Sequence, residues 1–125
     1  MKIKIGKYKV NRKIDIHIDN YDVWNLDNTL ALIIAPALIK LKEIKHGNGH
    51  VDNEDVPEEL HRPEGLKAFD VDDNWEARFD YILDELIWTF TTLSEDDVND
   101  VKYKLETRVN NGLRLFGKYY RGLWD

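Results

Sequence analysis

The sequence contains no cysteine and a single serine, Ser94, among its 125 residues. The absence of cysteine excludes disulfide bonds and thiolate metal sites, and it is compatible with a reducing cytoplasm. Ser94 stands where a helix cap is expected, so serine and cysteine nucleophiles are effectively excluded. The sequence also lacks a Walker loop, a GxGxxG fingerprint, a nucleophile elbow and an HExxH motif. These absences leave enzymatic activity open but favour a binding protein.

Long hydrophobic runs are also missing. The longest apolar stretch, residues 30–41, is interrupted by Pro36 and Lys40 and is too short for a transmembrane helix. The N-terminus is basic, but it has no apolar segment followed by a small-residue cleavage site, so no signal peptide is expected. We therefore expect a cytoplasmic protein without a membrane partner.

Acidic residues are absent from the first 13 residues and are outnumbered by basic ones at the C-terminal end. Residues 1–13 carry six basic residues and no acid, residues 14–97 carry six basic and 21 acidic residues, and residues 98–125 carry six basic and three acidic residues. The net charge of −6 therefore hides two basic ends around an acidic middle. The basic ends either attract an anion or pack against acidic surfaces of the chain or of a neighbouring subunit, and we favour the second interpretation.

The polarity pattern predicts one α+β domain over residues 1–125 that is mostly α-helical. Residues 2–10 and 13–19 alternate in polarity, which predicts a basic β-hairpin arm with its turn near Asn11 and a bulge at Gly6. The remaining residues, 20–125, are expected to form a helical body.

Three principal helices are expected in the body. The first runs from about residue 25 or 27 to residue 45, with a kink at Pro36, and the second runs from Asp73 to about Leu93. A third is expected to open at Ser94 with Asp97 in the capping-box position and to bend at residues 110–112. Its first apolar stripe is formed by Val98, Val101, Leu105 and Val109. A short helix over residues 57–61 is expected in the loop between the first two helices.

The apolar stripes of these helices predict the centre of the core. The residues expected there are Leu30, Ile33, Ile34, Leu38, Trp75, Phe79, Leu83, Leu86, Val101, Leu105 and Phe116. Four tryptophans in 125 residues exceed what so small a core usually holds. Trp24, Trp88 and Trp124 are therefore expected to help build an interface, because tryptophan is enriched at binding hot spots. We therefore expect a homo-oligomer, with the hairpin as a candidate exchanging arm.

Several longer motifs carry a family resemblance. They comprise Tyr21–Asn25 with Asp27 and Thr29–Ala31, Lys45–Gly47, Val51–Asp52 with Glu54–Leu60, and Asn111–Tyr120 closing at Leu123–Asp125. In these motifs the chain resembles an uncharacterised family of small tailed-bacteriophage proteins, over most of residues 19–125. The resemblance implies a phage gene expressed in an infected bacterium, and hence the host cytoplasm as location. It brings no catalytic residues with it.

A divalent metal is one candidate cofactor. His46, His50 and Asp52 lie close together in a glycine-containing loop, and imidazoles with carboxylates bind such ions. The more favoured interpretation is a helix C-cap followed by a polar loop. Asp80 and Asp84, with Glu85 beside them, form a second acidic group on the second helix, and such carboxylates can do acid–base work or hold Mg²⁺. The favoured interpretation is a solvated face, or ion pairs to Arg78 or to the lysines of the first helix.

The basic C-terminal segment holds the strongest candidate site. Arg114, Lys118 and Arg121 recur at helical spacing beside Tyr119, and residues 110–124 contain no acid. Arginine recognises phosphate and aromatic rings stack on bases, so these residues, with Asn111 beside them, suit a small anionic, nucleotide-like ligand. Nucleic acid is a less favoured ligand. The alternative, in which these charges face water or pair with the acidic middle, is favoured over ligand binding.

Together these features predict a phage accessory binding protein that engages a host protein or sequesters a small anionic ligand during infection. A small metal-dependent enzyme acting on nucleotides and a minor virion or assembly protein are the alternatives.

Overall fold

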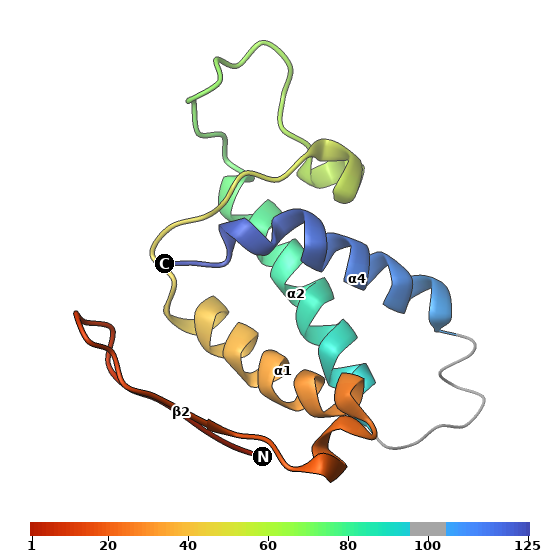
Figure 1. Ribbon diagram of the computed structural model, residues 1–125. Coiled ribbons are helices and arrows are strands. Elements are labelled where there is room, and N and C mark those ends of the chain that lie inside the picture. The colour runs from red at the N-terminus through yellow and green to blue at the C-terminus, as the bar shows by residue number, and fades with distance from the viewer. Residues whose placement is uncertain (96–104) are drawn as a thin grey trace.

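The computed structural model describes residues 1–95 and 105–125. An antiparallel hairpin of β1 (Lys2–Ile5) and β2 (Ile14–His17) precedes three helices, α1 (Leu26–Ile44), α2 (Trp75–Ser94) and α4 (Glu106–Tyr119). Short 3₁₀ turns precede α1 at Asn20–Val23, follow it at Asn53–Asp55 and Glu58–Leu60, and extend α4 at Tyr120–Gly122. This content confirms the expected fold class, α+β and mostly α-helical. Helix α2 lies behind and between the other two helices (Figure 1).

The hairpin is a regular ladder without a bulge. Its register pairs Ile3 with Ile16, and the Gly6 amide donates to the Lys13 carbonyl at 2.8 Å in the same register. The predicted bulge at Gly6 is therefore wrong. The alternation changes there because β1 ends at Ile5 and the chain enters a long turn, in which Asn11 adopts a positive φ of 63°.

Helix α2 is the centre of the body, since α1 and α4 both pack on it. Its fully buried residues include Phe79, Ile82, Leu83 and Leu86. Helix α1 continues through Pro36 and turns Ala31, Ala35 and Leu38 inward. Small alanines let the two helices approach closely, and the larger apolar residues of α1 remain beside the contact.

The ends of α2 and α4 differ from the expectation. Ser94 closes α2 instead of opening the next helix, and its hydroxyl donates to the Thr91 carbonyl at 2.7 Å. The predicted Asp97, Val98 and Val101 lie outside the described residues. The expected bend at residues 110–112 is also wrong, because α4 is one helix and Gly112 is buried against Thr89 of α2.

The predicted core is correct at its centre and wrong along one face of α1. Leu38, Phe79, Leu83 and Leu86 are buried as expected, and the partly buried residues Ile34 and Phe116 pack against this core. Leu30 and Ile33 are instead 44% and 39% exposed, because α4 packs on α2 and does not cover the outer part of the α1 stripe. The core residues that sequence reasoning missed are Ala31, Ala35, Val51, Val56, Ile82, Phe90, Leu115 and Tyr119.

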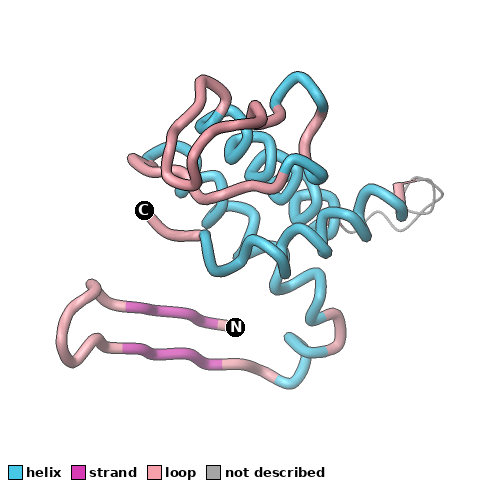
Figure 2. Tube along the Cα trace, turned by 90° about the horizontal axis from the view of Figure 1, so that it is seen from above, coloured by secondary structure: helices cyan, strands magenta, loops and turns pink. Residues whose placement is uncertain are grey.

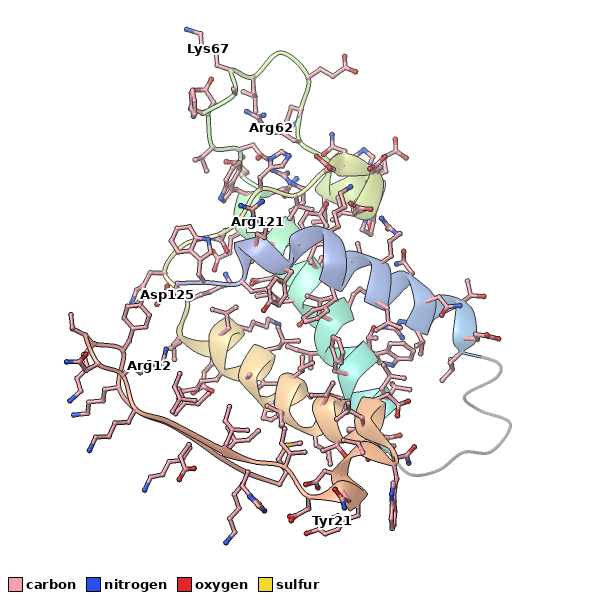
Figure 3. All side chains as sticks on the ribbon, viewed as in Figure 1. Arg12, Tyr21, Arg62, Lys67, Arg121 and Asp125 are labelled. Atoms are coloured by element: carbon pink, nitrogen blue, oxygen red, sulfur yellow. The ribbon has the colours of Figure 1, made fainter. Side chains whose placement is uncertain are left out.

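A long segment connects α1 to α2 and is fixed by a buried ion pair. Arg78 of α2 donates to both carboxylate oxygens of Asp72, at 2.6 and 2.9 Å, and to the Leu60 carbonyl. The loop that carries Arg62 and Lys67 projects from the body (Figures 1 and 3), and the Arg62 guanidinium binds two of its carbonyls. Among the described helices, none is long and apolar enough to cross a membrane.

Candidate functional site

The predicted basic segment converges on one buried carboxylate, that of Asp55. This side chain is only 1% exposed, and it lies in the turn after α1. Arg114 donates to its Oδ1 at 2.8 Å, while Lys118 and the Tyr119 hydroxyl donate to its Oδ2 at 2.6 and 2.5 Å. Three donors from two successive turns of α4 therefore hold the loop against the helix.

Lys118 occupies the centre of a wider acidic cluster. Its Nζ lies 2.9 Å from Asp52, 2.8 Å from Glu54 and 2.6 Å from Asp55. One oxygen from each carboxylate lies within 4.8 Å of the others, a spacing that a metal ion could bridge. In this arrangement the lysine ammonium group takes the position of the cation.

The ionisation of these groups reflects their mutual contacts. Burial raises the pKa of Asp55, but hydrogen bonds from Lys118, Tyr119 and Arg114 outweigh it, so that the net pKa lies below the ordinary value. The hydrogen bond to Asp55 is the largest cause that raises the pKa of Lys118. Burial, followed by the hydrogen bond to Asp55, raises the pKa of Tyr119 to about 12. Across the neutral range Asp55 and Lys118 therefore stay charged, while Tyr119 keeps its proton and can donate to Asp55.

The residues predicted to bind an anionic ligand are thus brought together around an acid of the same chain. Asn111 contributes its Oδ1, which accepts hydrogen bonds from Arg114 at 2.8 and 3.1 Å. Arg121 is exposed near the C-terminal end (Figure 3). The contacts match the alternative interpretation, in which the basic charges pair with the acidic middle. Anion binding by these residues stays a prediction.

The predicted metal ligands separate into two pairs. His46 lies against Asp125, whose carboxylate accepts from the His46 backbone amide at 2.6 Å and lies 3.0 Å from Nδ1. His50 and Asp52 do meet, with Nε2 and Oδ1 2.9 Å apart. The structure brings together two of the three predicted ligands, while the third ties the end of α1 to the C-terminus.

The carboxylates of α2 are also paired with cations. Lys42 donates to Asp84 at 2.6 Å, and Lys45 lies 3.0 Å from Asp80. Glu85 accepts two hydrogen bonds of 3.1 Å from Arg108 of α4. The pairs of Asp84 and Asp80 match the expectation of ion pairs between α2 and the lysines of the first helix, whereas Glu85 pairs with α4.

An apolar groove between α1 and α4 is the surface feature that sequence reasoning missed. One hollow of about 300 Å³ and a second of about 320 Å³ adjoin each other at Ile34 and Phe116, which line both, and the two together are here called the α1–α4 groove. Its apolar lining consists of Leu30, Ile33, Ile34, Ala37, Leu38, Leu41, Phe90, Leu93, Leu113, Phe116, Tyr120 and Leu123. The unusually wide apolar stripe of α1 was the available signal, since one partner helix cannot cover it.

Comparison with known proteins adds no relative: no family model, no curated protein and no solved structure matches the chain.

Proposed function

We propose that this chain is a phage accessory protein that acts by binding, and that the α1–α4 groove receives an amphipathic helix of a host protein. The observation that carries the proposal is the groove itself. Its two adjoining hollows are lined by residues from three helices, and large apolar side chains such as Leu30 and Ile33 remain exposed there. Grooves of this kind bind the apolar face of a partner helix.

The basic hairpin specifies the charge of the partner. Ile33 lines both the groove and a hollow of about 280 Å³ that Ile3 of the hairpin shares, so the hairpin borders the groove. Residues 1–13 contain six basic residues and no acid. The lysines that alternate with Ile3 and Ile5 lie on the far face of the hairpin. Their positive potential nevertheless favours a helix with acidic residues on its polar face.

Binding of a protein partner is better supported than the alternatives. Lys118 already contacts three carboxylates, which reduces its capacity to attract an anionic ligand. Asp80 and Asp84 are paired with lysines, so these two carboxylates give no specific support to an acid-dependent nucleotide enzyme.

A photo-crosslinking amino acid at position 33 tests the proposal in infected cells, with position 39 as the matched control. Ile33 and Ile39 lie on the same helix with similar exposure, but Ile39 is not part of the groove lining. We expect a host adduct only at position 33, and its crosslinked segment should be an amphipathic helix with an acidic polar face.

A synthetic peptide of that segment then measures the contact directly. Burying an isoleucine contributes about 1.5–3 kcal/mol, so Ile33→Gln should weaken binding at least about tenfold while Ile39→Gln leaves it unchanged. Equal effects of the two substitutions would refute the groove as the site. An adduct that maps to a second copy of this chain would also contradict the proposal, because it would make the groove a subunit contact.

A further inference from the structure

The free edge of β2 has a charge pattern that is complementary to itself. From Lys13 to Asp19 the chain alternates isoleucine with a charged or titratable residue, in the order Lys13, Asp15, His17 and Asp19. When the segment is placed antiparallel to a second copy, with Ile16 opposite Ile16 of that copy, each Lys13 faces an Asp19 and each Asp15 faces a His17. A carboxylate therefore meets a lysine or a histidine at every polar position, while isoleucine meets isoleucine at the others. Within one chain, His17 Nε2 also lies 2.9 Å from Asp19 Oδ1.

The hydrogen-bonding groups of β2 suit the same register. The Lys13 carbonyl accepts from Gly6 of the β1 side, so in an antiparallel ladder the odd-numbered residues of β2 point their backbone groups toward β1. The amides and carbonyls of Ile14, Ile16 and Ile18 consequently point to the free edge. In the register centred on Ile16 these three residues face one another, and each opposed pair exchanges two hydrogen bonds.

The surroundings of the hairpin leave this edge accessible. The sheet of the described residues has two strands, and Figure 2 shows β2 as the strand farther from the helices. Ile14, Ile16 and Ile18 are 63%, 50% and 53% exposed, although isolated two-stranded hairpins are marginally stable in water. A paired second hairpin adds cross-strand isoleucine contacts on the face that Ile3 turns toward α1.

We propose that the protein forms a two-fold symmetric dimer in which two β2 strands pair through this edge into a four-stranded sheet. The edge of β1 does not offer the same complementarity, because pairing two copies there about Ile3 places Lys2 opposite Lys4. Registers of β2 centred on Asp15 or His17 place like residues opposite each other. Exposed ion pairs contribute little affinity, so the charges select the register while backbone hydrogen bonds and isoleucine contacts hold the dimer. This inference is independent of the α1–α4 groove.

Proline substitution at two residues that face each other in the β1–β2 ladder tests which edge of the hairpin forms the dimer. Ile16→Pro removes an amide that points to the free edge of β2 and leaves the bonds to β1 intact. Ile3→Pro is the matched control, since Ile3 is the ladder partner of Ile16 and points its amide to the free edge of β1. Sedimentation equilibrium should give the wild type a mass twice the 14.8 kDa of one chain.

Ile16→Pro should weaken dimerisation about thirtyfold, since the two-fold axis removes two hydrogen bonds at once, and Ile3→Pro should leave it within about twofold. A monomeric wild type, or equal effects of the two prolines, would overturn the proposal.

The absence of cysteine allows a second test that also reports the register. In the proposed dimer the two Ile16 Cα atoms lie about 5.5 Å apart, within the range of a disulfide. The two Ile14 residues are offset by four strand positions, or about 13 Å, which is too far. Oxidation should therefore link Ile16→Cys into a covalent dimer and leave Ile14→Cys mainly monomeric. Equal linkage of the two variants would exclude this register.

Discussion

The contact between Gly112 of α4 and Thr89 of α2 gives the sharpest prediction of stability. A Cβ atom added at Gly112 would lie 2.7 Å from Thr89 Cβ and 2.8 Å from its Cγ2, closer than carbon atoms approach without displacement. Thr89 is fully buried, and its hydroxyl donates to the Glu85 carbonyl at 2.7 Å. The threonine cannot rotate its Cβ away, so Gly112→Ala must push the two helices apart.

The size of the effect follows from two opposing terms. Overpacking a core contact costs about 1–3 kcal/mol or more, and alanine in place of glycine contributes about 1 kcal/mol through helix propensity. Because the added Cβ would contact the Cβ of Thr89, which cannot move by rotation of the side chain, we expect an overpacking cost of about 3 kcal/mol. The net loss in the free energy of unfolding is then about 2 kcal/mol. Gly117→Ala is the control, since Gly117 lies on the same helix with nothing within 4 Å of an added Cβ, and it should stabilise by about 0.5–1 kcal/mol.

Urea denaturation of the two variants measures the difference, which should be about 3 kcal/mol in the free energy of unfolding. Exchanging the two residues provides a second check. Combining Thr89→Gly with Gly112→Ala restores the space at the crossing, so the double variant should be about 2 kcal/mol more stable than the sum of the single effects. If Gly112→Ala stabilised the protein as Gly117→Ala does, the close helix crossing would be refuted.

Three further predictions concern the charged groups. The hydrogen bonds from Arg78 lower the pKa of Asp72 to about 2, against about 3.9 when unfolded. The Asp72 carboxylate therefore contributes its full stabilisation above about pH 4 and loses it toward pH 2. Between these pH values, the free energy of unfolding measured in urea should fall more for the wild type than for Asp72→Asn. Equal falls in the two proteins would contradict the ion pair with Arg78. Lys118→Met should create a Mn²⁺ site visible by calorimetry, because it removes the ammonium group that Asp52, Glu54 and Asp55 share, although Arg114 still pairs with Asp55. No gain in binding would show that the ammonium does not substitute for an ion. Tyr119→Phe should cost about 1–2 kcal/mol by removing a buried hydrogen bond to Asp55, and an unchanged free energy of unfolding would count against that bond.

Elements defined by local periodicity were predictable from the sequence. The alternating residues before Asn20 gave the hairpin, and the stripe from Leu30 to Leu41 gave α1 nearly to its ends. Periodicity identifies an apolar face but not the area that neighbouring elements cover. Leu30 and Ile33 were therefore assigned to the core, although they line the α1–α4 groove.

Tertiary contacts were the part that local patterns could not supply. Asp55 meets Arg114 and Tyr119 across about half the chain, and only the complementary charge of the two segments indicated that they could pair. Gly112 shows a different ambiguity. Its low helix propensity predicted a bend, but in the structure the missing side chain serves the contact with Thr89.

The motifs that carry the phage resemblance contact one another in the structure. The segment that includes Asp55 meets the one that includes Lys118, and His46 at the end of α1 binds Asp125 through its backbone amide. Each of these two contacts joins residues that are more than 60 positions apart in the sequence, so the motif residues that form them stabilise the fold. A charged residue that balances another within the same chain has little remaining capacity to bind a ligand. These contacts do not use the apolar α1–α4 groove or the backbone groups at the free edge of β2, and binding should therefore be sought there.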